Sequence, residues 1–107
     1  MLFQISYSFN SKDDPDEGFF NMLDEIGPYH LGFDGFLLLD APYTARGLKD
    51  IFDEYFLLGK RGRYFIGRTV RDCSGCLHQK DKAFISRRWD RVPPIENLGT
   101  LPQKAED

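Results

Sequence analysis

The chain opens with LFQISYSF at residues 2–9, and this stretch sets the expected architecture. In it Phe3, Ile5, Tyr7 and Phe9 are separated by single polar residues. A period of two is the pattern of a β-strand that buries one face and exposes the other. The opening therefore predicts a strand that lies against an apolar core.

A helix is predicted directly after this strand. Asp14 precedes Pro15, and Glu17 follows Asp14 by three residues. This arrangement indicates an Asp N-cap, a proline at the first helical position and a capping-box acid. Large apolar residues then recur at helical spacing between positions 19 and 26, and Gly27 follows where a helix of this length would end.

The middle of the chain predicts a second strand and a second helix. The run FLLL at residues 36–39 is typical of a buried strand, since it is short, continuous and bounded by turn residues. Thr44 suits the N-cap of a helix that carries apolar residues at helical spacing and ends at Gly59. Two further strands are expected at residues 63–71 and 83–89, joined by a tight loop.

These elements predict an α+β ferredoxin-like sandwich of the order βαβαββ. Two helices would pack on one face of a four-stranded, mainly antiparallel sheet. We expect residues 1–91 to form this single domain, because 107 residues are too few for two cores. Residues 92–107, with three prolines and a charged end, are expected to form an extended arm or tail.

The charges divide sharply between the two halves of the chain. Residues 1–58 hold three basic and eleven acidic side chains, and residues 59–107 hold eleven basic and six acidic ones. Such a split predicts a bipolar surface. Either the two halves neutralise each other across the fold or between copies, or the charged faces bind partners.

Two sets of residues are candidate binding surfaces. The basic set combines arginines with aromatic residues, which suits phosphate contact and base stacking as well as a protein interface. It consists of Arg61, Arg63, Tyr64, Arg68, Arg71, Arg87, Arg88 and Trp89. The acidic set suits contact with a basic protein surface, or is simply a solvated helix face. It consists of Asp13, Asp16, Glu17, Asp24 and Glu25.

Four short runs resemble one known family. They are ISYSFN at 5–10, FLLLD at 36–40, TARGLK at 44–49 and GRYFI at 62–66. Over residues 2–70 the chain is similar to the small ferredoxin-like proteins of CRISPR adaptation and their VapD-type toxin relatives. The resemblance implies a homodimer paired through the sheet. Active nucleases of that family hold a metal with an Asp at the end of the first strand, whereas this chain has Ser8 there, and a serine hydroxyl is a poor Mg²⁺ ligand. The fold is therefore expected to carry over more readily than the activity.

Cys73, Cys76 and His78 form the one metal-like cluster of the sequence. Thiolates and imidazole suit Zn²⁺, but a structural site needs four ligands, and the other histidine, His30, is distant in sequence. The alternative is a glycine-containing turn that holds two thiols. We expect no cofactor, with zinc as the alternative.

Catalytic motifs are not found in the sequence. No Ser-His-Asp or Cys-His arrangement is recognisable, the phosphate-loop spacing is absent, and His30 is expected to be a surface histidine without a positioned partner. No apolar run reaches the roughly 20 residues of a membrane span, and the start does not resemble a signal peptide, so we expect a cytoplasmic protein with no membrane partner.

The leading functional hypothesis is a small non-enzymatic, protein-binding regulator or inhibitor of a nucleic-acid-handling complex. A phage-type, anti-CRISPR-like inhibitor fits its size and bipolar charge. The first alternative is a nucleic-acid-binding protein or a metal-dependent nuclease of the family above. The second is a zinc-bridged module.

Overall fold

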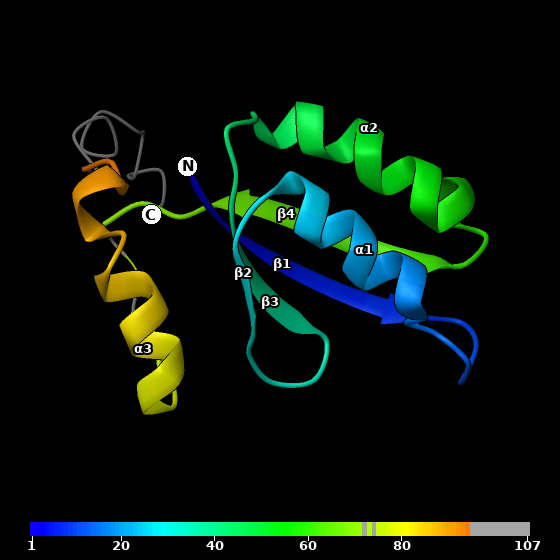
Figure 1. The fold of residues 1–107 in the computed structure, drawn as a ribbon, viewed down its shortest axis with the longest axis horizontal. Helices are drawn as coiled ribbons and strands as arrows, with labels where there is room; N and C mark the ends of the chain where they lie inside the picture. Colours follow the sequence, from blue (N-terminus) through cyan, green and yellow to red (C-terminus); the bar gives the residue numbers. More distant parts are fainter. Residues whose placement is uncertain (72, 74, 95–107) are drawn as a thin grey trace, which may run out of the picture.

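The computed structural model describes residues 1–71, 73 and 75–94, which form one sheet and three α-helices (Figure 1). In chain order the elements are β1 (Leu2–Phe9), α1 (Glu17–Ile26), β2 (Tyr29–Leu31), β3 (Phe36–Asp40), α2 (Ala45–Phe56), η1 (Leu57–Gly59), β4 (Gly62–Arg68), α3 (Gln79–Ser86) and η2 (Trp89–Arg91).

The sheet has the strand order β2-β3-β1-β4, and every neighbouring pair is antiparallel. The first strand is thus central, and its Ile5 lies opposite Leu37 on β3 and Ile66 on β4. The order βαββαβ of the strands, α1 and α2, together with this pairing, is the ferredoxin-like arrangement. The predicted fold class is confirmed.

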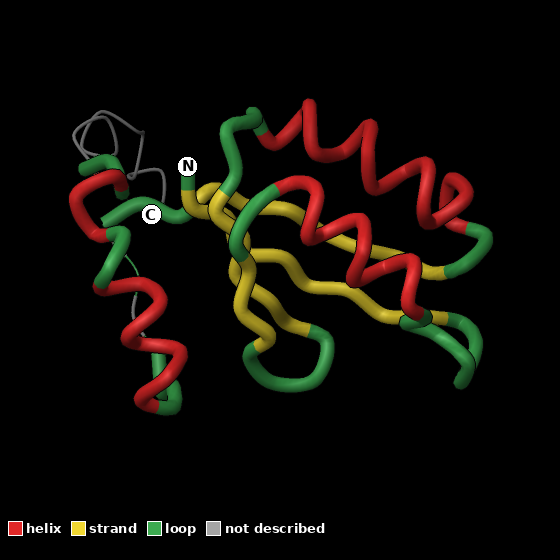
Figure 2. Tube along the Cα trace, viewed as in Figure 1, coloured by secondary structure: helices red, strands yellow, loops and turns green. Residues whose placement is uncertain are grey.

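The main core lies between the sheet and the two long helices. Figure 2 shows α1 and α2 over one face of the sheet, with α3 apart from them. Phe3 and Ile5 of β1 are fully buried against Phe19 of α1 and Phe52 of α2. Burying an apolar side chain of this size contributes about 2 kcal/mol. The alternation predicted for residues 2–9 is therefore what attaches this strand to the helices.

The helix starts were predicted with one error. Thr44 caps α2 as predicted, accepting a hydrogen bond from Gly47 N–H at 3.0 Å. The N-cap of α1 is Asp16, which accepts from Phe19 N–H at 3.2 Å, and not Asp14. Pro15, after a cis peptide bond, precedes the helix, and Asp14 lies 2.6 Å from Arg61. The local pattern assigned Asp14 to capping, but this residue instead forms an ion pair with Arg61 from a distant segment.

The predicted order of the last elements was wrong in two places. A three-residue strand, β2, follows α1 and was missed because Tyr29–Leu31 is too short for a periodic signal. The strand predicted at 83–89 is instead part of α3 and the turn after it. The third predicted strand ends at Arg68 rather than at residue 71, where the Arg71 N–H donates to Pro93 C=O.

The C-terminal side of the domain extends past the predicted boundary at residue 91. Val92 is buried in a second cluster with Leu2, Leu38 and Phe84. The rest of the predicted arm, from residue 95 onward, lies outside the described residues, as do Asp72 and Ser74 of the predicted loop. None of the helices described has the length and apolar content needed to cross a membrane.

Candidate functional site

The candidate site lies on the sheet face opposite α1 and α2, here called the open face. By register, Ser6 of β1 lies between Phe36 of β3 and Phe65 of β4 on this face. Phe65 is 74% exposed, and Phe33, in the turn before β3, is 61% exposed while its ring stacks on Phe36. Large aromatic side chains on and beside the sheet are thus presented to solvent.

At one end of the open face, Asp40 of β3 holds the C-terminal side of α3. Its carboxylate is buried and accepts hydrogen bonds from Arg88 Nε at 2.9 Å and from an Arg91 guanidinium nitrogen at 2.7 Å. The Arg88 guanidinium also lies 3.7 Å from the ring centroid of Phe84. The buried carboxylate is thereby paired, as a charge in this position requires.

A second polar contact joins the start of α3 to β2. His30 Nε2 lies 2.5 Å from the carboxylate of Asp81, which is buried and also accepts the His78 N–H at 3.1 Å. The hydrogen bond from His30, followed by that from His78, lowers the pKa of Asp81 below its usual range. The prediction of an unpartnered surface histidine at His30 was therefore wrong, since the ring is half-buried and also stacks on Phe84.

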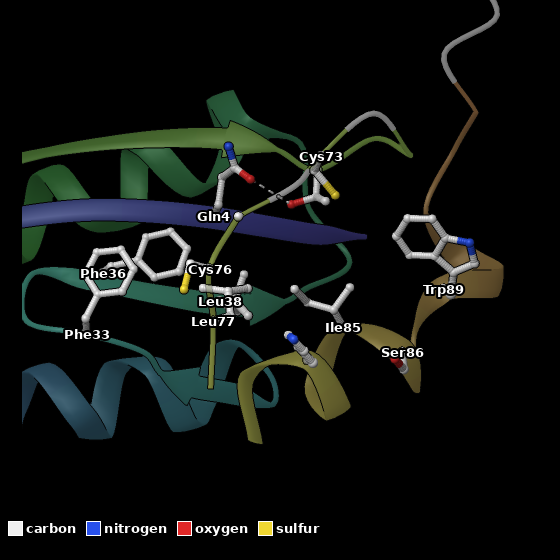
Figure 3. A pocket seen from close by; sticks show the side chains of 13 residues that line it. Gln4, Phe33, Phe36, Leu38, Cys73, Cys76, Leu77, Ile85, Ser86 and Trp89 are labelled. Atoms are coloured by element: carbon white, nitrogen blue, oxygen red, sulfur yellow. Dashed lines mark hydrogen bonds between the residues drawn. The ribbon is translucent and has the colours of Figure 1, made fainter. Parts of the chain in front are cut away.

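Between the open face and α3 lies a groove of about 980 Å³ (Figure 3). Figure 3 shows Phe33 and Phe36 at one end and Trp89 at the other, with apolar side chains between them. The apolar lining residues are Phe33, Phe36, Leu38, Leu77, Ile85 and Trp89. Among the lining residues that the structure describes, Lys82 is the one with a charged side chain, so the groove combines an apolar lining with a single cation.

Several residues of the predicted basic set are engaged within the fold. Arg61 pairs with Asp14 at 2.6 Å and with Asp16 at 3.0 Å, and its guanidinium lies 4.1 Å from the Tyr55 ring centroid. These carboxylates, Asp14 first, raise the pKa of Arg61 above its usual range. Burial, together with the hydrogen bond to Asp16, raises the pKa of Tyr55 to about 12.

Other residues of the predicted basic set also form hydrogen bonds or ion pairs within the fold. Arg71 donates to the carbonyl of Val92 at 2.8 Å and to that of Trp89 at 3.2 Å, and Arg88 pairs with Asp40. Tyr64 donates to Asp53 at 2.5 Å, and burial followed by this hydrogen bond raises the pKa of the phenol. These side chains join distant parts of the chain, so the predicted single basic surface is not formed.

Three arginines of the set remain exposed, and they do not form one hairpin. Arg63 and Arg68 lie near the two ends of β4, and Arg87 follows α3. Of the acidic set, Asp13, Glu17, Asp24 and Glu25 are exposed on or before α1, while Asp16 is the helix cap. Hydrogen bonds from Tyr55, and then from Arg61, lower the pKa of Asp16.

Cys73 and Cys76 are both exposed, and both line the groove. In the described part of the chain, no three His, Cys, Asp or Glu side chains come together in a group that could hold a metal ion. Cys73, Cys76 and His78 are thus not gathered into a zinc site there. Around Ser8, the described residues likewise include no such group of carboxylates.

The sequence did not indicate the groove. Its lining comes from a turn, two strands, a loop and α3, and no single stretch carries a recognisable pattern. The one local signal was Phe33, a large apolar residue between Gly32 and Asp34, where turns normally carry polar side chains. Trp89, one of the predicted binding residues, lines the groove, whereas the other apolar residues of its lining were not among the predicted ones.

Comparisons with protein-family models, with curated proteins and with solved structures find no match to this chain. The resemblance to the CRISPR-adaptation and VapD-type proteins therefore stays a prediction, and so does the homodimer that it implies.

Proposed function

We propose that this protein is a small non-enzymatic binding protein that regulates or inhibits a partner protein by holding a segment of it in the groove. The observation that carries the proposal is the apolar lining of the groove with two partly exposed aromatics, Phe33 and Trp89, at its ends. Exposed apolar surface of this kind is typical of binding sites. Tryptophan is also among the residues that contribute most to protein interfaces.

The groove favours an amphipathic segment with an acidic side chain. Leu77 and Ile85 would contact apolar side chains of such a segment, and Lys82 would pair with a carboxylate. A helix and an extended peptide are the two forms in which proteins commonly present short apolar segments, so either form could occupy the groove.

The acidic face of α1 supports a partner that handles nucleic acid. Glu17, Asp24 and Glu25 are exposed on this helix, on the side of the sheet away from the groove. Proteins that bind nucleic acid present basic surfaces to its phosphates. A protein attached through its groove could then place these carboxylates against such a surface and compete with the phosphates.

The proposal is tested by variants of the groove. Proteins that crosslink to the wild-type protein are identified and purified. Each is then titrated into the wild type and its variants, with the emission of Trp89 as the signal, since the chain has no other tryptophan. Phe33→Glu and Leu77→Glu are expected to lower the affinity for a partner that binds in the groove by at least about tenfold, which corresponds to the loss of one modest hot spot. Leu57→Glu, at a leucine that is 52% exposed at the end of α2 and away from the groove, is the control. Equal affinity for wild type and both groove variants would contradict the proposal.

A second candidate function is favoured by the row of Phe36, Ser6 and Phe65. The two rings flank a small residue and lie about 10 Å apart, twice the distance between neighbouring strands. Bases of a single strand stack on exposed aromatics, and the exposed Arg63, on the same face, would contact phosphate.

This candidate predicts that a labelled single strand binds with an affinity that falls as salt rises. Phe65→Ser should abolish the anisotropy change, whereas Leu57→Ser should leave it intact. A flat titration at low salt would exclude the second candidate, and it would leave the groove proposal standing.

A further inference from the structure

The groove is bordered by two thiols, those of Cys73 and Cys76, to which the proposed function gives no role. Both cysteines are exposed and free, and the chain has no other cysteine. Figure 3 shows Cys76 toward the Phe36 end of the groove and Cys73 toward the Trp89 end. A reagent in the groove therefore has access to both sulfur atoms, and a change at either one alters the lining.

The segment that carries the thiols is attached to the fold at both of its ends. Before it, Arg71 donates from its backbone N–H to Pro93 C=O at 2.9 Å and from its side chain to Val92 C=O at 2.8 Å. After it, the carboxylate of Asp81 accepts the His78 N–H at 3.1 Å and so holds the start of α3. The described residues between Arg71 and His78 lie in no helix, strand or turn. Their path along the groove is therefore set by the two attachments.

We propose that Cys73 and Cys76 are a dithiol modification site, which a low-molecular-weight disulfide oxidises to an intramolecular disulfide that closes the groove. The inference rests on the proposed function, because it concerns the regulation of the same groove. The Cys-x-x-Cys spacing permits the bond. The first and fourth Cα atoms of a β-turn lie within about 7 Å, and a disulfide needs about 4.4–6.8 Å. Gly75 occupies the third position of such a turn, where a type II turn requires a positive φ.

The chemistry consists of two successive thiol–disulfide exchanges. The thiolate of one cysteine attacks a sulfur of the small disulfide, whose S–S bond breaks, so that a mixed disulfide forms on the protein and one small thiolate leaves. The thiolate of the other cysteine then attacks the protein sulfur of this mixed disulfide and releases the second small thiolate. The two protein thiols thus lose two electrons and two protons, and the small disulfide is reduced to two thiols. The second exchange is favoured because it is intramolecular, between residues of one short segment.

The disulfide would shorten a segment whose ends are held. Three residues of extended chain span up to about 10 Å, whereas a disulfide holds its two Cα atoms about 6 Å apart. With Arg71 and His78 fixed, the residues between them must take another path. Leu77 follows Cys76 directly, and both line the groove, so the apolar lining moves with the sulfur atom. The groove that the proposed function requires is therefore a property of the reduced protein.

Mass spectrometry of the intact protein after treatment with oxidised glutathione tests the chemistry. The wild type is expected to lose two hydrogen atoms and to retain no glutathione, because the second thiol displaces it. Cys73→Ser and Cys76→Ser are the matched controls, and each should keep one glutathione as a mixed disulfide. Dithiothreitol should reverse both changes. A wild type that kept glutathione on both cysteines, or that did not react, would overturn the inference.

The second measurement follows the groove itself, with the fluorescent dye anilinonaphthalene sulfonate as the probe. This dye joins aromatic rings to a sulfonate, which suits the apolar lining and Lys82. The share of its binding that Phe33→Glu removes is the share in the groove. Oxidation of the wild type is expected to lower the affinity of this share at least about fourfold, the effect of losing about one buried methylene group. The double variant Cys73→Ser/Cys76→Ser should show no effect of the oxidant.

This inference and the proposed function fail on different results. Dye binding that is equal in the oxidised and reduced wild type would overturn the inference, and the reduced protein would still hold its partner in the groove. A partner that binds the wild type and the groove variants equally would contradict the proposed function, whatever the state of the two thiols. Neither measurement on the thiols uses a partner protein, so the two outcomes are read independently.

Discussion

Replacing Asp40 with asparagine is expected to lower the free energy of unfolding by about 2 kcal/mol, because a buried cation loses its charged partner. The side chain of Asp40 is 10% exposed and that of Arg88 is 15% exposed, so neither charge is well solvated. Breaking a buried pair by removing one partner costs about 3–5 kcal/mol. A value of about 2 kcal/mol, below this range, is expected here for two reasons. Asparagine retains an acceptor, and Arg88 keeps its hydrogen bond to Phe84 C=O at 3.1 Å.

A double-mutant cycle isolates the pair. Arg88→Met keeps the apolar stem of the side chain and removes the charge, and the coupling with Asp40→Asn is expected to be about 1.5 kcal/mol. The control cycle uses Lys49 and Asp53, an ion pair on α2 in which Lys49 is 61% exposed. Exposed pairs of this spacing contribute about 0.3–0.5 kcal/mol.

Urea unfolding measures both cycles, followed by Trp89 emission and by far-ultraviolet circular dichroism. Trp89 lies directly after Arg88 and reports the docking of α3, whereas circular dichroism reports the whole fold. A coupling for Asp40 and Arg88 no larger than that of the control cycle would refute the argument that this carboxylate holds α3 on the sheet. The argument would also be refuted if the urea midpoint followed by Trp89 emission were the same in Asp40→Asn as in the wild type.

Three further results are expected. The pKa of Asp81 is lowered in the folded protein, so the stabilising effect of this carboxylate is complete above the ordinary pKa of 3.8 and is lost as the pH falls through the lowered value. Acid unfolding of Asp81→Asn, followed by Trp89 emission, should therefore depend less steeply on pH than that of the wild type. Leu58 is 81% exposed with a φ of +55°, and Leu58→Gly should raise the free energy of unfolding by about 1 kcal/mol in urea titrations, since glycine adopts this conformation freely. Phe52→Ala should cost about 4 kcal/mol and Phe65→Ala less than about 0.5 kcal/mol by the same assay, and equal losses would contradict the assignment of buried and open faces.

Local patterns were sufficient for the ferredoxin-like core. The alternation of Phe3 and Ile5 with polar residues identified the buried face of β1, and the cap at Thr44 placed the start of α2. Both features depend on near neighbours in sequence. The strand β2 lacked such a signal, because three residues are too few for a period and its pairing partner β3 decides its conformation.

The error over α3 has a different physical cause. Ala83, Phe84 and Ile85 form a short apolar run that fits a strand as well as a helix, and the helix buries only Asp81 and Phe84. Its conformation is favoured by contacts with His30 and Asp40, which come from strands about fifty residues earlier. The groove follows from this placement, so it could not be predicted once the helix was taken for a strand.

The central position of β1 also bears on synthesis. This strand leaves the ribosome before the other strands of the sheet, because its two neighbours, β3 and β4, are made later, and Phe3 pairs with Arg68. Until β3 and β4 have been made, the apolar side of β1 is not fully covered, and the nascent chain exposes an apolar segment. Long-range pairing of this kind slows folding and leaves such segments open to chaperones in the meantime. A pause in translation before β4 has emerged from the ribosome would therefore prolong that exposure, whereas a pause after its emergence would give the sheet time to close.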